Sequence, residues 1–250
     1  MAKLTKKQIK LHEEANKILE KPILSIEEKE FVLNNWRPEA ENNVASNGVF
    51  FTPPEIAHEL HVATGDSTGK VLDLCAGIGR LGFTLLHYGL FREKPLEITA
   101  IEKNPKFVEV GKKILPEANW ICMDVFIEKN WNDNNLEDEY FDFVISNPPF
   151  GHITNSEWRG LYTTADLLCV AIGFDKSKYG GIYILPTGNI PWEYSGKMTY
   201  TEKNSLNWNK LKRFYPTINA GCTSIDVSEF KKQWSDVSPN VEIVDITKSE

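Results

Sequence analysis

The segment VLDLCAGIGRLG at residues 71–82 constrains the possible fold of this chain more than any other feature. Residues 70–75 form a short apolar run that predicts a buried strand. Gly77, Gly79 and Gly82 come next, and a stretch with helical periodicity follows them. Glycines between a strand and a helix let the backbone turn tightly and approach a ligand closely. The pattern therefore favours a ligand-binding turn over the alternative, a tight turn with no ligand.

Strand-like and helical patterns alternate along the rest of the chain. A helix is predicted to begin at Pro105, and another lies near residues 163–174. The further strands are predicted at residues 98–102, 120–124, 140–146, 181–185, 223–227 and 241–246. Such alternation predicts an α/β fold, with a mainly parallel, seven-stranded sheet covered by helices on both faces.

The N-terminal part shows a different pattern, with two helices and no strand. Residues 4–20 have apolar side chains at mostly helical spacing. Ser25 and Glu28 form a capping-box signature at the start of a second helix. We expect a helical extension over residues 1–45 and a second domain over residues 46–250.

Composition excludes several classes of protein. The net charge is −7, which argues against binding nucleic acid by bulk electrostatic attraction. The four cysteines lack CxxC or CxxH spacing, so neither a metal site nor a disulfide framework is expected. There is no apolar run of about 20 residues, and no apolar stretch after the N-terminal lysines, so neither a membrane span nor a secretory signal is expected. The expected location is the cytoplasm of a bacterium or a phage host.

Acidic residues occur at three consecutive predicted strands. Glu102 ends the second strand, where a carboxylate can accept both hydroxyl protons of a ribose. This is compatible with a nicotinamide dinucleotide or with S-adenosylmethionine. Asp73, which can orient a cationic amino group, and Asp124, which can accept a bond from an adenine amino group, favour S-adenosylmethionine. The alternative for each carboxylate is a solvated strand end.

The sequence Asn147-Pro148-Pro149-Phe150 follows an apolar strand, at the edge where open α/β sheets place ligands. Two prolines remove two backbone donors and stiffen the turn. The Asn147 side-chain oxygen and a proline carbonyl can then accept the two hydrogen bonds of an exocyclic amino group. Phe150 can stack on a planar base or amide. The alternative is a rigid loop with a buried phenylalanine.

Together these motifs resemble the amino-methyltransferases, in particular the N6-adenine methyltransferases of DNA and RNA. The resemblance covers about residues 46–186 and includes a Thr-Pro segment within residues 48–55. It implies a Rossmann-like class I methyltransferase fold and S-adenosylmethionine as the cofactor. The catalytic residues that it implies are Asn147, Pro148, Pro149 and Phe150. The cofactor-binding residues that it implies are Phe51, Thr52, Asp73, Ala76, Gly77, Gly79, Glu102, Lys103, Asp124, Val125 and Asn147.

The motif order is that of gamma-type DNA methyltransferases, which usually carry a large target-recognition domain after the catalytic half. This chain departs from that pattern, because about a hundred residues follow Phe150 and the sheet should use most of them. The predicted function is methyl transfer to adenine N6 in DNA with short or relaxed sequence specificity. The predicted partner is DNA, with RNA possible, and a homodimer or a partner protein is compatible with the sequence.

Several alternative functions stay open. An RNA adenine methyltransferase could use the same motifs. A protein-glutamine methyltransferase more often has Tyr where Phe150 stands. A nicotinamide-dependent oxidoreductase would have no use for the Asn-Pro-Pro-Phe sequence, and a non-enzymatic binding subunit would not need it intact.

Two weaker patterns suggest contacts with a nucleic-acid substrate. Lys210, Lys212 and Arg213 lie among aromatic residues, a mixture that can bind phosphates and bases or simply form the solvated face of a helix. His152, Trp158 and Arg159 follow the Asn-Pro-Pro-Phe sequence, and we consider them as substrate contacts or as part of a lid.

Overall fold

The computed structural model describes residues 4–40, 51–65, 68–88, 96–151, 157–186, 190, 193–194, 197–198, 202–223 and 241–249. The helices are α1 (Lys6–Leu19), α2 (Ile26–Asn35), the 3-10 turn η1 (Pro38–Ala40), α3 (Pro54–Thr64), α4 (Arg80–His87), α5 (Pro105–Ile114), α6 (Glu128–Asp133), α7 (Ala165–Lys176) and α8 (Glu202–Phe214). The strands are β1 (Gly69–Leu74), β2 (Leu96–Glu102), β3 (Asn119–Cys122), β4 (Phe143–Ser146), β5 (Gly180–Pro186), β6 (Glu193–Tyr194), β7 (Lys197–Met198), β8 (Ile218–Thr223) and β9 (Val241–Lys248).

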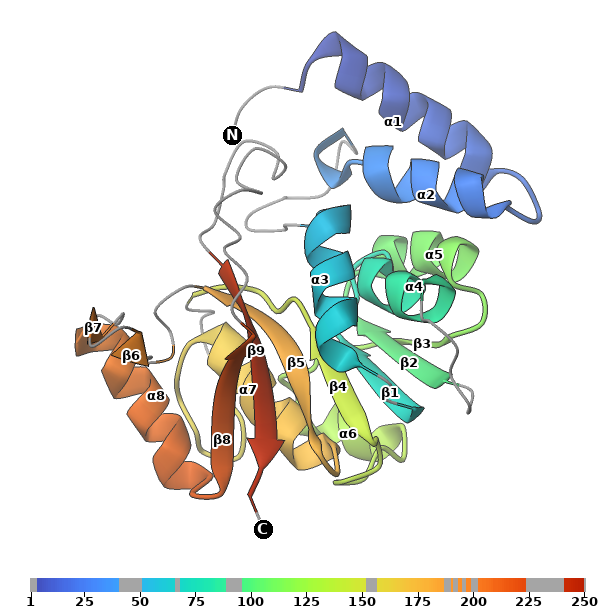
Figure 1. The fold of residues 1–250 in the computed structure, drawn as a ribbon. Helices are drawn as coiled ribbons and strands as arrows, with labels where there is room; N and C mark the ends of the chain where they lie inside the picture. Colours follow the sequence, from blue (N-terminus) through green and yellow to red (C-terminus); the bar gives the residue numbers. More distant parts are fainter. Residues whose placement is uncertain are drawn as a thin grey trace.

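Seven strands form one sheet in the order β3-β2-β1-β4-β5-β9-β8. The first five of these pair in parallel, and β9 runs antiparallel to both of its neighbours (Figure 1). This confirms the predicted seven-stranded, mainly parallel sheet. The short strands β6 and β7 pair with each other outside it.

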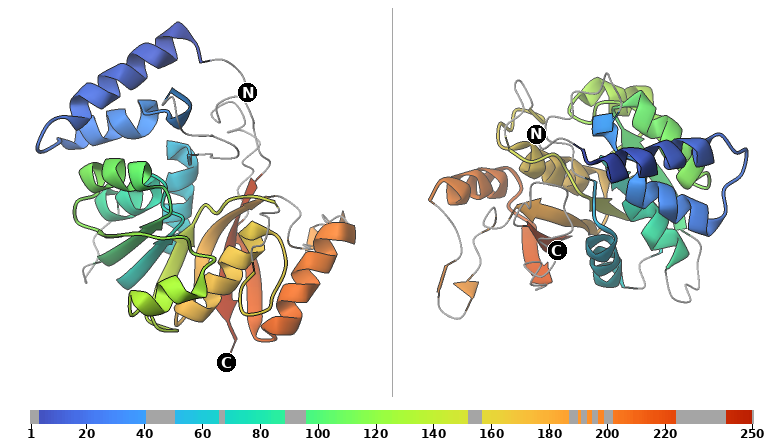
Figure 2. Two further views of the ribbon diagram at one scale, coloured as in Figure 1. Left: turned by 180° about the vertical axis from the view of Figure 1, so that it is seen from behind. Right: turned by 90° about the horizontal axis from the view of Figure 1, so that it is seen from above.

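Alternate side chains of the strands enter two separate hydrophobic cores. Val71 of β1 packs with residues of α3, α4 and α5 on one face. Its neighbours Leu72 and Leu74 pack with residues of α7 and α8 on the other. Figures 1 and 2 show the two helical layers with the sheet between them. The apolar runs of the central strands are continuous because both of their faces are buried.

Helices α1 and α2 form an antiparallel pair, which we call the N-terminal hairpin, and it lies over α4 and α5 (Figure 1). The predicted capping box is present at the start of α2, where the Ser25 hydroxyl accepts from the Glu28 amide. A second capping box, formed by Thr5 and Gln8, begins α1. The predicted domain boundary after residue 45 lies outside the described residues and stays a prediction.

The predicted strand at residues 223–227 was misplaced. Strand β8 occupies Ile218–Thr223, so only its last residue falls in the predicted range, and residues 224–227 lie outside the described part of the chain. Within residues 218–221 Ile218 alone is buried, because β8 lies at the edge of the sheet. An edge strand with so few buried side chains lacks the apolar pattern that marks the central strands.

Candidate active site

A cavity opens at the carboxyl edge of the sheet, where β1, β2, β3 and β4 end. The ends of these strands and the segments that follow them line it, together with Phe51, which precedes α3, and Phe107 of α5. This edge is where open α/β sheets bind ligands, because the connections to the helices leave a crevice there. The lining residues are Phe51, Cys75, Gly77, Ile101, Glu102, Lys103, Phe107, Met123, Asp124, Val125, Phe126, Asn147, Pro148, Pro149 and Phe150.

The backbone of the glycine turn is left-handed at three positions. The φ angles are 64° at Cys75, 58° at Gly77 and 89° at Gly79. A Cβ atom on Gly77 would lie 3.3 Å from the Phe51 ring, so this glycine leaves room for the cavity wall. Gly79 and Ala76 do not line the cavity. A Cβ atom on Gly79 would lie 3.0 Å from the Trp120 ring, so a glycine at this position lets the start of α4 pack closely against Trp120 of β3.

Asp73 lies beneath the glycine turn and does not line the cavity. Its side chain is fully buried, and its Oδ2 accepts a hydrogen bond from the Gly82 amide at 3.0 Å. Burial raises the pKa of Asp73 to about 7, although the Gly82 amide opposes this rise. The structure thus places Asp73 where it holds the first turn of α4, rather than at the cavity surface where the sequence pattern suggested it.

Glu102 lines the cavity at the end of β2. Its Oε2 accepts from the Gly77 amide at 3.0 Å and its Oε1 accepts from the Asn104 amide at 2.8 Å. Burial raises the pKa of this carboxyl, against the effect of these backbone donors. Each carboxylate oxygen has a second lone pair, so Glu102 can brace the turn and still accept bonds from a ligand.

Asp124 and Val125 follow β3 and line the same cavity. The Asp124 Oδ1 accepts from the Phe126 amide at 3.0 Å, which holds the carboxylate at the strand end. The Val125 carbonyl accepts from the buried Trp131 ring Nε1 at 2.8 Å. Lys103, the last of the predicted residues in this region, is exposed and lies on the cavity wall beside Glu102.

Asn147 stands at the junction of β4 and the two prolines. Its Nδ2 donates to the Thr52 Oγ at 2.9 Å, which links it to the segment before α3. Thr52 is 6% exposed and does not line the cavity. The adjacent Ser146 hydroxyl donates to the Leu74 carbonyl at 2.5 Å and so ties the end of β4 to the end of β1. Phe150 is half-buried in the cavity wall.

Sequence reasoning missed five lining residues: Cys75, Ile101, Phe107, Met123 and Phe126. Four of them directly precede or follow a predicted site residue, so a search of the residues adjacent to the motifs would have found them. Phe107 lies on α5, and its apolar helical position gave no sign of a role beyond the core.

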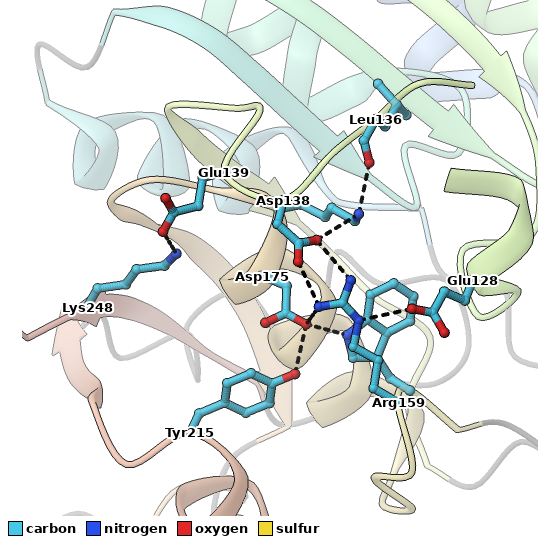
Figure 3. Close-up of polar contacts among 10 residues, drawn as sticks. Glu128, Leu136, Asp138, Glu139, Arg159, Asp175, Tyr215 and Lys248 are labelled. Atoms are coloured by element: carbon cyan, nitrogen blue, oxygen red, sulfur yellow. Dashed lines mark hydrogen bonds and ion pairs between the residues drawn. The ribbon is translucent and has the colours of Figure 1, made fainter. Parts of the chain in front are cut away.

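Trp158 and Arg159, considered above as substrate contacts, do not line the cavity, and Arg159 lies in an ion-pair network (Figure 3). Arg159 pairs with Glu128, Asp138 and Asp175 at 3.1, 2.8 and 3.1 Å. The Trp158 indole Nε1 donates to Asp175 at 2.7 Å. Asp138 and Asp175 precede β4 and β5, whereas Asn147 follows β4. The network therefore lies toward the amino edge of the sheet, opposite Asn147. His152 lies outside the described residues.

The basic residues of α8 also lie away from the cavity. Trp208 and Leu211 are the buried face of this helix, whereas Lys210, Lys212 and Arg213 are exposed. The first residue of β8 pairs with Lys248 of β9, and the first residue of β5 pairs with the adjacent Thr247. Both strands therefore begin at the same edge of the sheet, and helix α8 ends just before β8. Its last turn is therefore at the amino edge of the sheet, and the interpretation as the solvated face of an amphipathic helix fits it better.

The cavity fits S-adenosylmethionine in the chemistry of its walls. Aromatic and aliphatic side chains suit the adenine ring and the carbons next to the sulfonium. Glu102 and Asp124 offer carboxylates to hydroxyl and amino groups. The missing Cβ at Gly77 lets backbone and ligand approach each other.

Among the described helices, none is long and apolar enough to cross a membrane.

Comparison with known proteins agrees with this assignment. Residues 55–168 match the family model of the methyltransferase small domain. No curated protein matches the chain. The type I restriction-modification methyltransferase subunit from Streptococcus thermophilus is similar in structure, with a TM-score of 0.59, 15% identity, and 90% of this chain and 49% of that chain covered. The present chain thus spans about half the length of that subunit.

In two further structures, the similarity extends over nearly the whole length of both chains. One, from Pyrococcus horikoshii, is described as an RNA methyltransferase and has a TM-score of 0.51 at 18% identity, with 98% of each chain covered. The other is an O-methyltransferase from Bacillus cereus in complex with S-adenosylhomocysteine, with a TM-score of 0.51, 13% identity, and 96% of this chain and 100% of that chain covered. At these identities the similarity establishes the class I Rossmann-like methyltransferase fold.

Proposed function

We propose that this S-adenosylmethionine-dependent methyltransferase transfers a methyl group to the N6 amino group of adenine in DNA. The observation that carries the proposal is the position of Asn147, Pro148 and Phe150 in the wall of the cofactor cavity. An amide, a backbone carbonyl without neighbouring N–H donors, and an aromatic ring therefore border the place where the cofactor binds. This combination suits a flat base that carries an exocyclic amino group.

On the cofactor side, we assign Glu102 to the ribose hydroxyls and Asp124 to the adenine amino group. Both carboxylates line the cavity and both are held by backbone amides. The Gly77 backbone and the Phe51 ring form the adjoining wall. Asp73 supports the turn from below, because its Oδ2 accepts from the Gly82 amide of α4.

On the acceptor side, Asn147 Oδ1 and the Pro148 carbonyl are the proposed acceptors for the two amino protons. Accepting both bonds draws the amino nitrogen towards tetrahedral geometry and frees its lone pair for attack. When bound, S-adenosylmethionine supplies a sulfonium-activated methyl group, so no strong base is needed. The nitrogen then loses one of its two original protons, which leaves through the acceptor that holds it to solvent.

Thr52 has a defined part in this arrangement. Its Oγ accepts a bond from Asn147 Nδ2, so the amide presents Oδ1 on the side away from Thr52. The opposite amide orientation would turn Oδ1 toward the Thr52 hydroxyl and would present the Nδ2 donor, instead of an acceptor, to the amino group of the substrate. We therefore assign Thr52 as a positioning residue for Asn147, in place of the direct cofactor contact that the resemblance implied.

DNA is proposed as the substrate because the motif order is that of gamma-type DNA methyltransferases and because a restriction-modification methyltransferase subunit shares the fold. In a duplex the adenine must leave the base stack, at a cost of a few kcal/mol. Base-edge contacts specify sequence, and few of the described residues outside the fold's own layers are available for them. We therefore expect a short or relaxed recognition sequence.

RNA is the second candidate, favoured by the similar structure described as an RNA methyltransferase. The deciding experiment incubates the enzyme with tritiated S-adenosylmethionine and separate pools of unmethylated plasmid DNA, transcribed RNA and protein. Nucleoside analysis should find label in the N6-methyl-2′-deoxyadenosine of DNA. Label in RNA or in glutamine would replace the proposal, and single-molecule sequencing of the plasmid would show how long the recognised sequence is.

A further inference from the structure

The N-terminal hairpin contacts the aromatic wall of the cofactor cavity through one residue. Trp36 follows α2 and is 1% exposed. Its ring centroid lies 6.0 Å from that of Phe51 and 5.7 Å from that of Phe107. The Phe51 and Phe107 centroids are 5.3 Å apart, and both residues line the cavity. The three rings thus form one cluster, with two members in the cavity wall and one supplied by the hairpin.

Helix α1 determines the orientation of the Trp36 ring. The indole Nε1 donates to Asn16 Oδ1 at 3.0 Å. The next backbone amide, that of Arg37, donates to His12 Nδ1 at 3.0 Å. Both acceptors lie on α1, so the end of α2 is fastened to its partner helix on two sides. The ring that supports the cavity wall is therefore held by the hairpin itself.

The hairpin also docks onto the segment that forms the glycine turn. Val32 and Leu33 share a buried cluster with Ile78, the residue between the first two glycines of the turn. The Arg80 Nη2, at the start of α4, donates to Asn34 Oδ1 at 2.7 Å. Lys29, which is 7% exposed, pairs with Glu117 at 3.7 Å.

We propose that the hairpin is part of the cofactor site, with Trp36 as the positioning residue that holds Phe51 and Phe107 in the cavity wall. Residues 51–53 belong to no strand or helix, so packing alone orients the Phe51 ring. A wall that is ordered before binding spares the ligand the entropic cost of ordering it. The inference concerns the cofactor alone and does not depend on the methyl acceptor. It also assigns a role to residues that precede the matched family segment.

Thermodynamic linkage gives the proposal a second consequence. If the docked hairpin raises the affinity for S-adenosylmethionine, the bound cofactor must stabilise the docked hairpin by the same factor. Backbone amides of α2 should then exchange with solvent more slowly when the cofactor is bound. A hairpin that only braces the fold would show no such response.

The binding test compares two apolar substitutions in the same hairpin. Trp36→Leu removes the aromatic support, whereas Leu24→Ala removes a buried side chain from the α1–α2 connection, at the other end of α2. Calorimetry should show S-adenosylmethionine binding weakened about tenfold or more by Trp36→Leu, and changed less than about twofold by Leu24→Ala. Trp36→Phe should restore most of the affinity. Unchanged affinity in Trp36→Leu, or equal weakening in Leu24→Ala, would overturn the proposal.

Hydrogen exchange on the unaltered protein covers the case in which Trp36→Leu does not fold. Exchange at Val32 and Leu33 is measured with and without S-adenosylmethionine, and Leu211 of α8 is the reference because it lies in a different core. Slower exchange at the two α2 positions, with little change at Leu211, supports the proposal. The absence of a cofactor effect on α2 contradicts it.

Discussion

The pKa values of buried and partly buried acidic residues shift in opposite directions at the two edges of the sheet. At the carboxyl edge, burial raises the pKa of Asp73 and of Glu102, and in the described part of the chain neither forms an ion pair. On the opposite side, Asp138 pairs with Arg159 and Lys176, and Asp142 pairs with Lys178. The hydrogen bonds and charges of these cations lower the pKa of both aspartates, although partial burial opposes them.

The contrast shows which edge is built for stability and which for a ligand. Paired charges on the opposite side fasten α6, α7 and the segment around Arg159 to one another (Figure 3). At the carboxyl edge, backbone amides donate to Asp73 and Glu102, and among the described residues neither carboxylate forms an ion pair. Buried carboxylates without cations cost stability when ionised, and such cost is characteristic of binding sites.

The largest expected effect is on the pH dependence of stability. Folded Asp73 keeps its proton up to a pKa of about 7, whereas an unfolded aspartate releases it near 3.8. Between these values the folded state binds more protons, so stability falls as pH rises, by up to about 1.4 kcal/mol per pH unit. Denaturant unfolding should show this slope for the wild type and a flatter curve for Asp73→Asn.

Asp138 supplies the opposite control for that measurement. Its pKa is lowered in the folded state, so its stabilising contribution is present above the ordinary value and is lost as the pH falls below about 4. Asp138→Asn should therefore flatten the acid end of the curve, and from about pH 5 to 8 it should lower the stability without changing the slope against pH. Identical curves for Asp73→Asn and the wild type would remove the contrast between the edges.

Asn147→Ala should have the largest effect on the reaction. Loss of a group that stabilises developing charge typically lowers the rate about 100- to 1,000-fold. Cofactor affinity should stay within about twofold, because the amide is assigned to the acceptor. Methyl transfer to plasmid DNA and calorimetry with S-adenosylmethionine separate the two effects. A normal transfer rate would mean that the acceptor site has been assigned wrongly.

Glu102→Ala should act on the cofactor instead. It removes a carboxylate proposed to accept hydroxyl protons, and hydrogen bonds to charged groups contribute about 1.5–3 kcal/mol. Binding of S-adenosylmethionine should weaken by this amount in calorimetry. The Gly77 amide also loses its acceptor, so circular dichroism must show that the fold is kept. Unchanged affinity would exclude Glu102 from the cofactor site.

Thr52 provides a finer comparison within the carboxyl edge. Thr52→Val keeps the shape of the side chain but cannot accept the Asn147 Nδ2 bond, so the transfer rate should fall about tenfold with cofactor affinity unchanged. Thr52→Ser should retain the rate. In the Asn147→Ala background the valine substitution should have no further effect. Weakened cofactor binding by Thr52→Val would instead support a direct cofactor contact.

Arg159→Met should have the smallest effect, and on stability only. The guanidinium is about one-third exposed, so its three ion pairs together should contribute only about 1 kcal/mol. The melting temperature should fall modestly, while cofactor affinity and transfer rate stay at wild-type values. A large loss of activity with little loss of stability would show that the opposite side of the fold contributes to the reaction.

Local patterns predicted most of the fold correctly. The capping box at Ser25, the first-turn Pro105 and the glycine turn after β1 each depend on neighbours within a few residues. Their backbone geometry could therefore be predicted from the sequence. The edge strand β8 was misplaced because its pairing with β9, rather than its own apolar pattern, defines it.

The sequence by itself determined the strand–turn–helix order and placed Glu102, Asp124 and Asn147 at strand ends that converge on one cavity. Only the tertiary structure decided which side chains reach it. Asp73 faces α4 because strand side chains alternate, and so it binds the Gly82 amide below the turn. Trp36, Phe51 and Phe107 meet from three distant segments, and Arg159 turns away to its acidic partners. Contacts between distant segments depend on how the layers pack, which no local pattern encodes.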